Sequence, residues 1–318
     1  MTYRLVFFGT PEFAVPTLAA LAESADMEIV GVVTQPDARR SRRGDPEPSP
    51  VKSYAQGHGL GPIWQPERLR RDRPILDALT VAAADFFVVV AYGQILSPEV
   101  LSLPRLGCIN IHGSLLPKYR GAAPIQWAIA RGETLTGITT MLMDEGIDTG
   151  AMLLTATQAI APDTNAETLA AQLASLGAAL LLKTLRCFAS LTPTPQNGEE
   201  ATNAPLITKE DLIVSWSEPA KRIHDRIRAF YPQCYTTFGD QRLKILATRC
   251  LEPQPANASQ SPGQIEQISK QGAFTVQTGS GLLEVLTVQA AGKKVQTAWE
   301  FANGARLQVG DRLGDSPA

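Results

Sequence analysis

Two segments of the sequence carry polar side chains whose types and spacing suit chemistry at a carbonyl group. In the first, Asn110 and His112 stand one residue apart near the end of an apolar run that begins at Gly107. Alternate residues of a strand share a face, so an amide donor and an imidazole that titrates near neutrality would lie side by side. Taken alone, such a pair more often consists of buried structural residues with satisfied hydrogen bonds.

The second segment, residues 137–150, predicts a strand that continues into a glycine-punctuated loop with two carboxylates, Asp144 and Asp148. A carboxylate in this loop could hold an imidazole in one tautomer and pass protons, which is the orienting role in catalytic constellations. Asp and Gly are also common in turns for backbone reasons, so a plain turn remains the more frequent explanation. Either aspartate could be the functional one.

The elements around these segments predict an α/β fold for the first two thirds of the chain. Short apolar, β-branched runs alternate with helical patterns, which is typical of a Rossmann-like, mostly parallel sheet covered by helices. Such sheets place their ligands at the carboxyl ends of strands, where Asn110 and His112 are expected to lie. The predicted strands are residues 4–8, 28–33, 86–92, 107–112 and 137–143.

A change of composition divides the chain. Residues 191–208 are rich in Thr, Pro, Asn, Gly and Glu and predict a linker. Beyond them, one amphipathic helix at 218–229 precedes several short strands with Gly and Pro turns, a pattern that favours an OB-fold-like β-barrel. We therefore expect a Rossmann-like domain at 1–190, a linker at 191–208 and an OB-fold-like C-terminal domain at 209–318.

Composition excludes several classes of protein. A hydrophobic fraction of 44% and a charged fraction of 19% in 318 residues are ordinary for a globular chain. We see no apolar run that approaches the ~20 residues of a membrane span, and Gly9 and Pro11 interrupt any signal-peptide core, so we expect a cytoplasmic protein with no membrane contact. Four distant cysteines and three histidines predict no metal site. The turn at residues 9–13 lacks the glycines of a nicotinamide-binding G-x-G-x-x-G motif.

Together, the two chemical segments match the pattern of a known family. NIHGSLLP at 110–117, RGAAPIQW at 120–127, Asp144 and DTG at 148–150 resemble the folate-dependent formyltransferases, and most strongly the methionyl-tRNA formyltransferase family. Further matches are FGTPEF at 8–13, TQPD at 34–37, PSPVK at 48–52, VAYG at 90–93 and AGKK at 291–294. The resemblance covers nearly the whole chain. Its SLLP block is specific for the formyl donor and the reaction rather than for the acceptor.

The resemblance implies that a formyl group passes from 10-formyltetrahydrofolate, a reduced folate, to the α-amino group of methionine on initiator tRNA. The product would be N-formylmethionyl-tRNA for translation initiation. Asn110 and His112 would donate hydrogen bonds to the formyl oxygen, and Asp148 would hold His112 and help to move the proton of the attacking amine. The residues expected to shape the folate pocket are Ser114, Leu115, Leu116 and Pro117. We expect a monomer.

Basic residues are the candidates for tRNA binding. In the family, the loop after the second strand reaches the acceptor stem, and here that loop carries Arg39, Arg40, Arg42 and Arg43. The acidic residues that follow at 45 and 47 leave open which arginine reads the stem. Lys209, Lys293 and Lys294, with the arginines of the 218–229 helix, could form a phosphate track, although ordinary surface charge explains each of them equally well.

Other functions share part of this pattern. A formyltransferase that acts on an amino sugar nucleotide, or a 10-formylfolate hydrolase module, would also use Asn110, His112 and Asp148, but neither accounts for the arginine-rich loop. The glycinamide ribonucleotide enzymes resemble the N-terminal domain only. A non-catalytic RNA-binding module would leave the three polar residues without a role.

Overall fold

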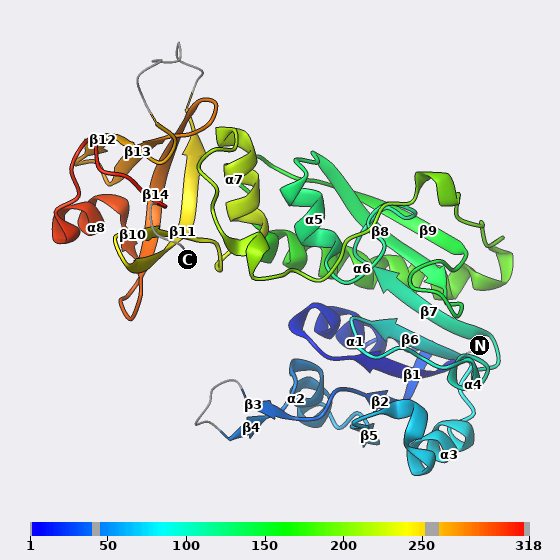
Figure 1. Ribbon diagram of the computed structural model, residues 1–318. Coiled ribbons are helices and arrows are strands. Elements are labelled where there is room, and N and C mark those ends of the chain that lie inside the picture. Colours follow the sequence, from blue (N-terminus) through cyan, green and yellow to red (C-terminus); the bar gives the residue numbers. More distant parts are fainter. Residues whose placement is uncertain (1, 40–44, 252–260, 315–318) are drawn as a thin grey trace. The chain divides into compact units, whose positions relative to one another are not determined.

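The computed structural model describes residues 2–39, 45–251 and 261–314, which form two compact units (Figure 1). The first unit consists of Met1–Gly121, Leu135–Ala159 and Ala170–Ala204, and the second of Ala122–Thr134, Ile160–Leu169 and Pro205–Ala318. Two segments from the first two thirds of the sequence therefore belong to the C-terminal unit, and no change of composition marks them.

The first unit is built on a sheet of seven strands, counted over the described residues, in the order β5-β2-β1-β6-β7-β8-β9. Neighbours from β5 to β7 are parallel, whereas β8 is antiparallel to both β7 and β9. The strands are β1 (Tyr3–Gly9), β2 (Met27–Val33), β5 (Ile63–Trp64), β6 (Phe86–Val90), β7 (Gly107–His112), β8 (Leu135–Leu142) and β9 (Met152–Ala159). The predicted α/β fold with a mostly parallel sheet is confirmed.

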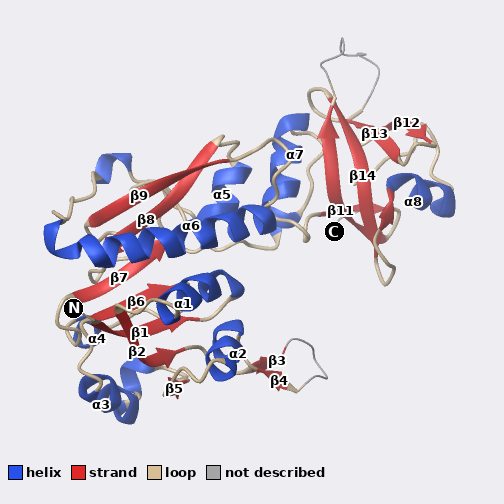
Figure 2. Cartoon of the chain, turned by 180° about the vertical axis from the view of Figure 1, so that it is seen from behind, coloured by secondary structure: helices blue, strands red, loops and turns tan. Residues whose placement is uncertain are grey.

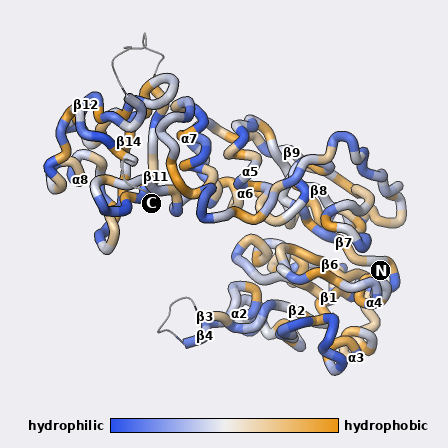
Figure 3. Tube along the Cα trace, viewed as in Figure 1, coloured by the Kyte–Doolittle hydropathy of each residue, from blue (hydrophilic) through white to orange (hydrophobic). Residues whose placement is uncertain are grey.

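Both faces of the central strands are covered, which explains why β6 is apolar throughout (Figure 3). On one face, Phe8 and Phe87 belong to a core cluster that Leu79 and Val100 complete from α3 and α4. The helices of this unit are α1 (Val15–Ala22), α2 (Pro50–Gly57), α3 (Arg73–Val81), α4 (Pro98–Leu101) and most of α6 (Ala166–Cys187). The short hairpin of β3 (Ala38–Arg39) and β4 (Pro46–Glu47) projects from the unit.

Helix α6 packs against β7 and β8. The hydroxyls of Thr184 and Thr140 lie 2.9 Å apart, and a Cβ on Gly177 would come within 3.1 Å of Ile111. The prediction that no apolar run is as long as a membrane span is wrong, because residues 166–190 are long and apolar enough to cross a membrane by length and composition. Half of an 18-residue window within that stretch is buried inside the protein, and a core helix passes the same test.

The second unit contains an antiparallel sheet in the order β10-β11-β14-β13-β12, with β15 paired to β14 (Figure 2). Its strands are β10 (Tyr235–Phe238), β11 (Gln241–Cys250), β12 (Ile265–Ser269), β13 (Ala273–Gln277), β14 (Leu282–Ala290) and β15 (Gln296–Thr297). Its helices include α5 (Pro124–Ala130), α7 (Ala220–Ala229) and α8 (Ala298–Ala305). The strand prediction overlooked α8, whose sequence signal is the capping box of Thr297 and Glu300.

Candidate active site

Strand β7 ends at His112 and places two polar side chains on one face of the sheet. Asn110 is 9% exposed and His112 is 5% exposed, although both lie in a strand between apolar neighbours. Buried polar groups of this kind need hydrogen-bond partners. The hydrogen-bond partners of Asn110 and His112 therefore identify the site.

The partner that the two side chains share is Asp148. Its Oδ1 accepts a hydrogen bond from Asn110 Nδ2 at 3.4 Å, and its Oδ2 lies 3.5 Å from His112 Nδ1. Oδ2 also accepts a hydrogen bond from the backbone N–H of Gly121 at 2.8 Å. The structure therefore brings the three residues predicted to be catalytic together around one carboxylate, all within the first unit.

The orientation of His112 is set by a residue that the sequence did not suggest. His112 Nε2 lies 2.8 Å from the carbonyl oxygen of Tyr119. A carbonyl oxygen only accepts, so Nε2 must donate and Nδ1 is left on the side of Asp148. Of the two ring nitrogens, only Nδ1 is therefore available to a substrate.

Asp148 itself adopts a strained backbone conformation, with a φ of +54° in the left-handed region. The loop around it is tightly confined, because a Cβ on Gly150 would lie only 1.7 Å from the carbonyl oxygen of Leu142. Asp144, the competing carboxylate, turns within the loop and accepts hydrogen bonds from Gly146 N at 3.0 Å and from Thr149 Oγ1 at 2.6 Å. Asp144 thus supports the turn, and Asp148 faces Asn110 and His112.

The side chain of Gln196, from the predicted linker, braces the loop that contains Asp148. Gln196 Nε2 donates to the carbonyl oxygens of Asp148 and Gly150, each at 2.8 Å. Gln196 Oε1 accepts from Arg120 Nε at 2.9 Å and from Nη2 at 2.8 Å. One side chain from residue 196 therefore ties the Asp148 loop to the segment that contains Tyr119 and Gly121. Sequence reasoning missed Gln196 because it lies among turn-forming residues.

The chain after Gln196 stays on the first unit as far as Ala204. Thr202 Oγ1 accepts from Tyr119 N at 2.8 Å, and Ala204 N donates to Arg120 O at 2.7 Å. Gly121, at φ +116°, permits this approach, because a Cβ there would lie 2.7 Å from the carbonyl oxygen of Ala204. Residues 196–204 thus support the backbone of both Tyr119 and Gly121.

The residues expected to shape the folate pocket form the turn after β7. Ser114 is fully buried, and its Oγ donates to the carbonyl oxygen of Lys118 at 2.6 Å. Thr139 Oγ1 donates to Ser114 O at 2.8 Å and accepts from Leu116 N at 3.0 Å. Leu116 is also buried, whereas Leu115 and Pro117 are partly exposed. The Ser114 side chain therefore stabilises the turn, and a ligand could reach the partly exposed Leu115 and Pro117.

A cavity of about 510 Å³ opens in the first unit just after β6. Ile95, 75% exposed, and Leu96 give it apolar surface, and Glu145 from the Asp148 loop also lines it. The Gln94 side chain fixes one wall by donating to Pro66 O at 3.0 Å and accepting from Leu69 N at 2.9 Å. Its volume suits a drug-sized ligand, and it adjoins the carboxyl end of a strand.

Two neighbouring titratable groups are unsuited to acid–base or nucleophilic work. Burial raises the pKa of the Cys108 thiol to about 12, so this β7 side chain stays neutral. Burial also raises the pKa of Tyr92, 2% exposed, well above its usual value. Within the described ranges, no group of three or more His, Cys, Asp and Glu side chains could hold a metal ion.

The residues predicted to bind tRNA are exposed where they are described. Arg39 lies in β3, Lys209 precedes a short 3₁₀ turn, and Lys293 and Lys294 lie in the turn between β14 and β15. Arg40, Arg42 and Arg43 lie outside the described residues. Arg228 of the predicted phosphate track is only 6% exposed and donates to Asp225 Oδ1 at 2.9 Å, so it serves the packing of α7.

Solved structures with the same fold come from several formyl-transfer and folate-binding proteins. An N-formyltransferase from Helicobacter canadensis, in complex with folinic acid and dTDP-3-aminofucose, has a TM-score of 0.65 at 18% identity and covers 90% of this chain and 98% of its own. HypX from Aquifex aeolicus, in complex with tetrahydrofolic acid, has a TM-score of 0.63 at 15% identity, over 97% of this chain and 48% of its own. At these identities the likeness concerns the fold.

Relatives found by their sequences are far more similar to this chain. The formyl transferase family model matches residues 3–185, and the model of the formyl transferase C-terminal domain matches residues 206–306. The methionyl-tRNA formyltransferase of Gloeothece citriformis is 51% identical over 98% of this chain and 99% of its own length. That of Microcystis aeruginosa is 52% identical over 97% and 98%. The chain therefore belongs to the formyl transferase family, in the group of the methionyl-tRNA formyltransferases.

Proposed function

We propose that the protein transfers the formyl group of 10-formyltetrahydrofolate to the α-amino group of methionine on initiator tRNA. The observation that carries the chemistry is the convergence of Asn110, His112 and the Gly121 amide on the Asp148 carboxylate. The acceptor is supported by identities near 50% to methionyl-tRNA formyltransferases over almost the whole chain. The expected product is N-formylmethionyl-tRNA for translation initiation.

The site supplies a path for each charge in the reaction. As the amine nitrogen bonds to the formyl carbon, Asn110 Nδ2 donates to the oxygen on which negative charge develops. His112 Nδ1 donates to the same oxygen when the ring is in its imidazolium form, because Nε2 keeps its own proton for the carbonyl oxygen of Tyr119. Asp148, already within 3.5 Å of both side chains, takes the proton released by the amine nitrogen. Breaking the bond between the formyl carbon and the folate nitrogen completes the transfer, and Asp148 returns the proton to that nitrogen.

We propose that the cavity after β6 receives the reduced folate. It adjoins the loop that carries Asp148, because Glu145 lines the cavity and lies three residues earlier. Ile95 and Leu96 would contact the flat pterin ring, while Leu115, Leu116, Pro117 and the backbone of Ser114 would contribute from the turn after β7. None of these contacts requires a metal.

A transfer assay with three acceptors tests the function. Labelled 10-formyltetrahydrofolate is offered in parallel to methionine-charged initiator tRNA, charged elongator tRNA and a UDP-amino sugar. We expect label on the initiator tRNA only. Label on the amino sugar would favour the alternative of a sugar nucleotide formyltransferase, and release of free formate in all three reactions would favour a hydrolase.

We propose the following division of labour along the chain. The catalytic domain predicted at residues 1–190 continues through the segment 191–208 as far as Ala204, and residues 209–318 form an OB-fold-like, tRNA-binding domain. The antiparallel sheet of the second unit supports the last assignment, since small β-barrels often bind nucleic acids. We further propose that the enzyme acts in the cytoplasm as a monomer.

The exposed lysines of the second unit give a salt-dependent prediction. Replacing both Lys293 and Lys294 with alanine is expected to flatten the dependence of tRNA affinity on salt by up to about two units of slope, one for each lost phosphate contact. Affinity measured between about 50 and 200 mM salt checks this. An unchanged slope would show that these lysines lie outside the tRNA interface. It would not contradict the proposed transfer reaction.

The brace of Gln196 gives a second prediction. Gln196→Ala removes two hydrogen bonds to the Asp148 loop and the acceptor for Arg120, so we expect kcat to fall by about tenfold to a hundredfold. Gln196→Glu keeps the bonds to Arg120 but sets a carboxylate against two carbonyl oxygens, and should not rescue the rate. Gln308→Ala, an exposed position in the second unit, is the control.

A positioning role predicts a particular kinetic signature. Because Gln196 acts through the backbone carbonyls of Asp148 and Gly150, its loss should lower kcat more than it changes KM, with the folded structure retained. Equal rates for Gln196→Ala and Gln308→Ala would show that the loop holds its shape without the brace.

A further inference from the structure

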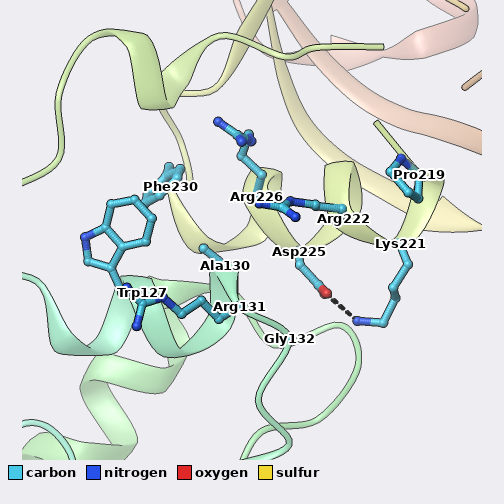
Figure 4. Close-up of a pocket in the computed structure, with 10 residues that line it drawn as sticks. All are labelled: Trp127, Ala130, Arg131, Gly132, Pro219, Lys221, Arg222, Asp225, Arg226 and Phe230. Atoms are coloured by element: carbon cyan, nitrogen blue, oxygen red, sulfur yellow. Dashed lines mark hydrogen bonds and ion pairs between the residues drawn. The ribbon is translucent and has the colours of Figure 1, made fainter. Parts of the chain in front are cut away.

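A second cavity, of about 500 Å³, lies between α5 and α7 (Figure 4). All of its lining residues belong to the second unit, so its shape depends on that unit alone. One wall comes from α5 and the turn that follows it, including Trp127 and Arg131. The other wall comes from α7 and its flanks, from Pro219 to Phe230.

The cavity is strongly cationic. Its basic lining residues are Arg131, Lys221, Arg222 and Arg226. The lining carboxylate, Asp225, is 3% exposed and already binds the buried Arg228, as well as Lys221 Nζ at 2.6 Å. Even when Glu218 is added, which lies 3.7 Å from Arg222 Nε, the four lining cations outnumber the two carboxylates. Such a surplus favours an anionic ligand.

Arg222 is the cation best placed to reach such a ligand. Its side chain is 68% exposed, against 21% for Arg226, which is bound to Glu218 at 3.2 Å and to the carbonyl oxygen of Asp211 at 3.1 Å. The 3.7 Å contact of Arg222 with Glu218 is longer than a hydrogen bond. Its guanidinium donors therefore remain largely available to phosphate oxygens.

An aromatic surface adjoins these cations. Trp127 Nε1 donates to the carbonyl oxygen of Pro205 at 2.8 Å, so the indole has already used its polar group. Phe230 meets it edge to face, with ring centroids 5.5 Å apart and an interplanar angle of 78°. The Arg131 guanidinium lies 5.7 Å from the indole centroid. What Trp127 offers to the cavity is therefore a fixed, apolar ring surface.

We propose that this cavity binds one unpaired nucleotide of the tRNA, with its base against Trp127 and its phosphate against Arg222 and Lys221. Cations beside an immobilised aromatic ring are the features by which proteins hold single-stranded RNA, since each base stacks and each linkage carries a charge. A base inside a double helix could not reach the ring. The inference rests on the proposed function for the identity of the RNA.

A pair of matched arginine variants tests the charged half of the site. Arg222→Gln and Arg249→Gln each remove one charge from the second unit at side chains 68% and 62% exposed, and each arginine pairs with one glutamate. With initiator tRNA as the probe, Arg222→Gln should reduce the salt slope of binding by about one, whereas Arg249→Gln should leave it unchanged. Equal slopes for the two variants overturn the inference.

A pair of tryptophan variants tests the stacking half. Trp127→Leu should weaken tRNA binding by roughly fivefold to a hundredfold, whereas Trp127→Phe, which keeps a ring, should retain most of the affinity. Thermal unfolding of both variants identifies any loss of packing against Phe230. If Trp127→Leu binds tRNA normally while an oligoglutamate peptide competes through Arg222, the cavity is an acidic-peptide site and the inference is wrong.

The binding and transfer assays separate this inference from the proposed function. A protein that binds tRNA through Arg222 and Trp127 but forms no formylated product supports the cavity and contradicts the proposed function. A protein that forms the product, with tRNA affinity unchanged in both Arg222→Gln and Trp127→Leu, keeps its proposed function and loses the cavity.

Discussion

Replacing Asp148 with alanine is expected to lower the rate of formyl transfer by on the order of a thousandfold or more. The change removes a proton acceptor and also the oxygens that engage Asn110, His112 and the Gly121 amide. Because the proton acceptor of the reaction disappears, the dependence of kcat on pH should change as well. Turnover with methionine-charged initiator tRNA, measured across pH, checks both effects.

Asp144→Ala is the matched control for this prediction. It removes a carboxylate four residues away whose hydrogen bonds, to Gly146 and Thr149, lie within the loop. We expect a milder loss and an unchanged pH profile. Asp148→Asn keeps the size of the side chain, and a rate as low as that of Asp148→Ala would assign the loss to the charge. Equal losses for Asp144→Ala and Asp148→Ala would mean that the roles of the two carboxylates were assigned wrongly.

Asn110→Ala is expected to lower kcat by about a hundredfold to a thousandfold, the usual cost of one lost oxyanion donor. The amide of Asn110 now faces Asp148 at the long distance of 3.4 Å, so it can turn to a developing oxyanion at little cost. The effect should fall on kcat more than on KM, because the charge develops only in the transition state.

The control for Asn110 is Asn303→Ala, the same chemical change at an exposed position of α8. It should leave kcat unaltered. The thermal unfolding temperature of Asn110→Ala must also be recorded, since Asn110 is buried and its loss removes a hydrogen bond. Near-normal turnover in a folded Asn110→Ala protein would reject the oxyanion role.

The sequence predicted the candidate site best where the local hydrophobic pattern agrees with the observed fold. Residues 107–112 form a largely buried strand, and the alternation of its side chains correctly places Asn110 and His112 on the same face. The loop from 144 to 150 follows β8, the strand paired with β7, which explains why Asp148 meets both side chains. Strand β9 was missed because it lies at the edge of the sheet and none of its residues is fully buried, so its sequence lacks a strong apolar pattern.

The partners of the catalytic candidates were not predictable from pattern. The hydrogen bond of His112 ends on the backbone carbonyl of Tyr119, and every residue type has such a carbonyl. Gln196 contacts Asp148 across 48 positions of sequence, and its neighbours are turn-forming residues that indicate only a linker. Ile95 and Leu96, the apolar residues described in the lining of the cavity after β6, lie in a loop, where hydrophobic periodicity gives no signal.

The path of residues 196–204 bears on how the protein can be divided. The family model of the N-terminal part ends at residue 185, a natural place to trim a recombinant fragment. A fragment cut there would retain Asn110, His112 and Asp148 but lose Gln196 and Thr202, which support the surrounding backbone. The catalytic module therefore extends beyond the end of the family model. Its last nine residues support the active site, although their composition is that of a spacer.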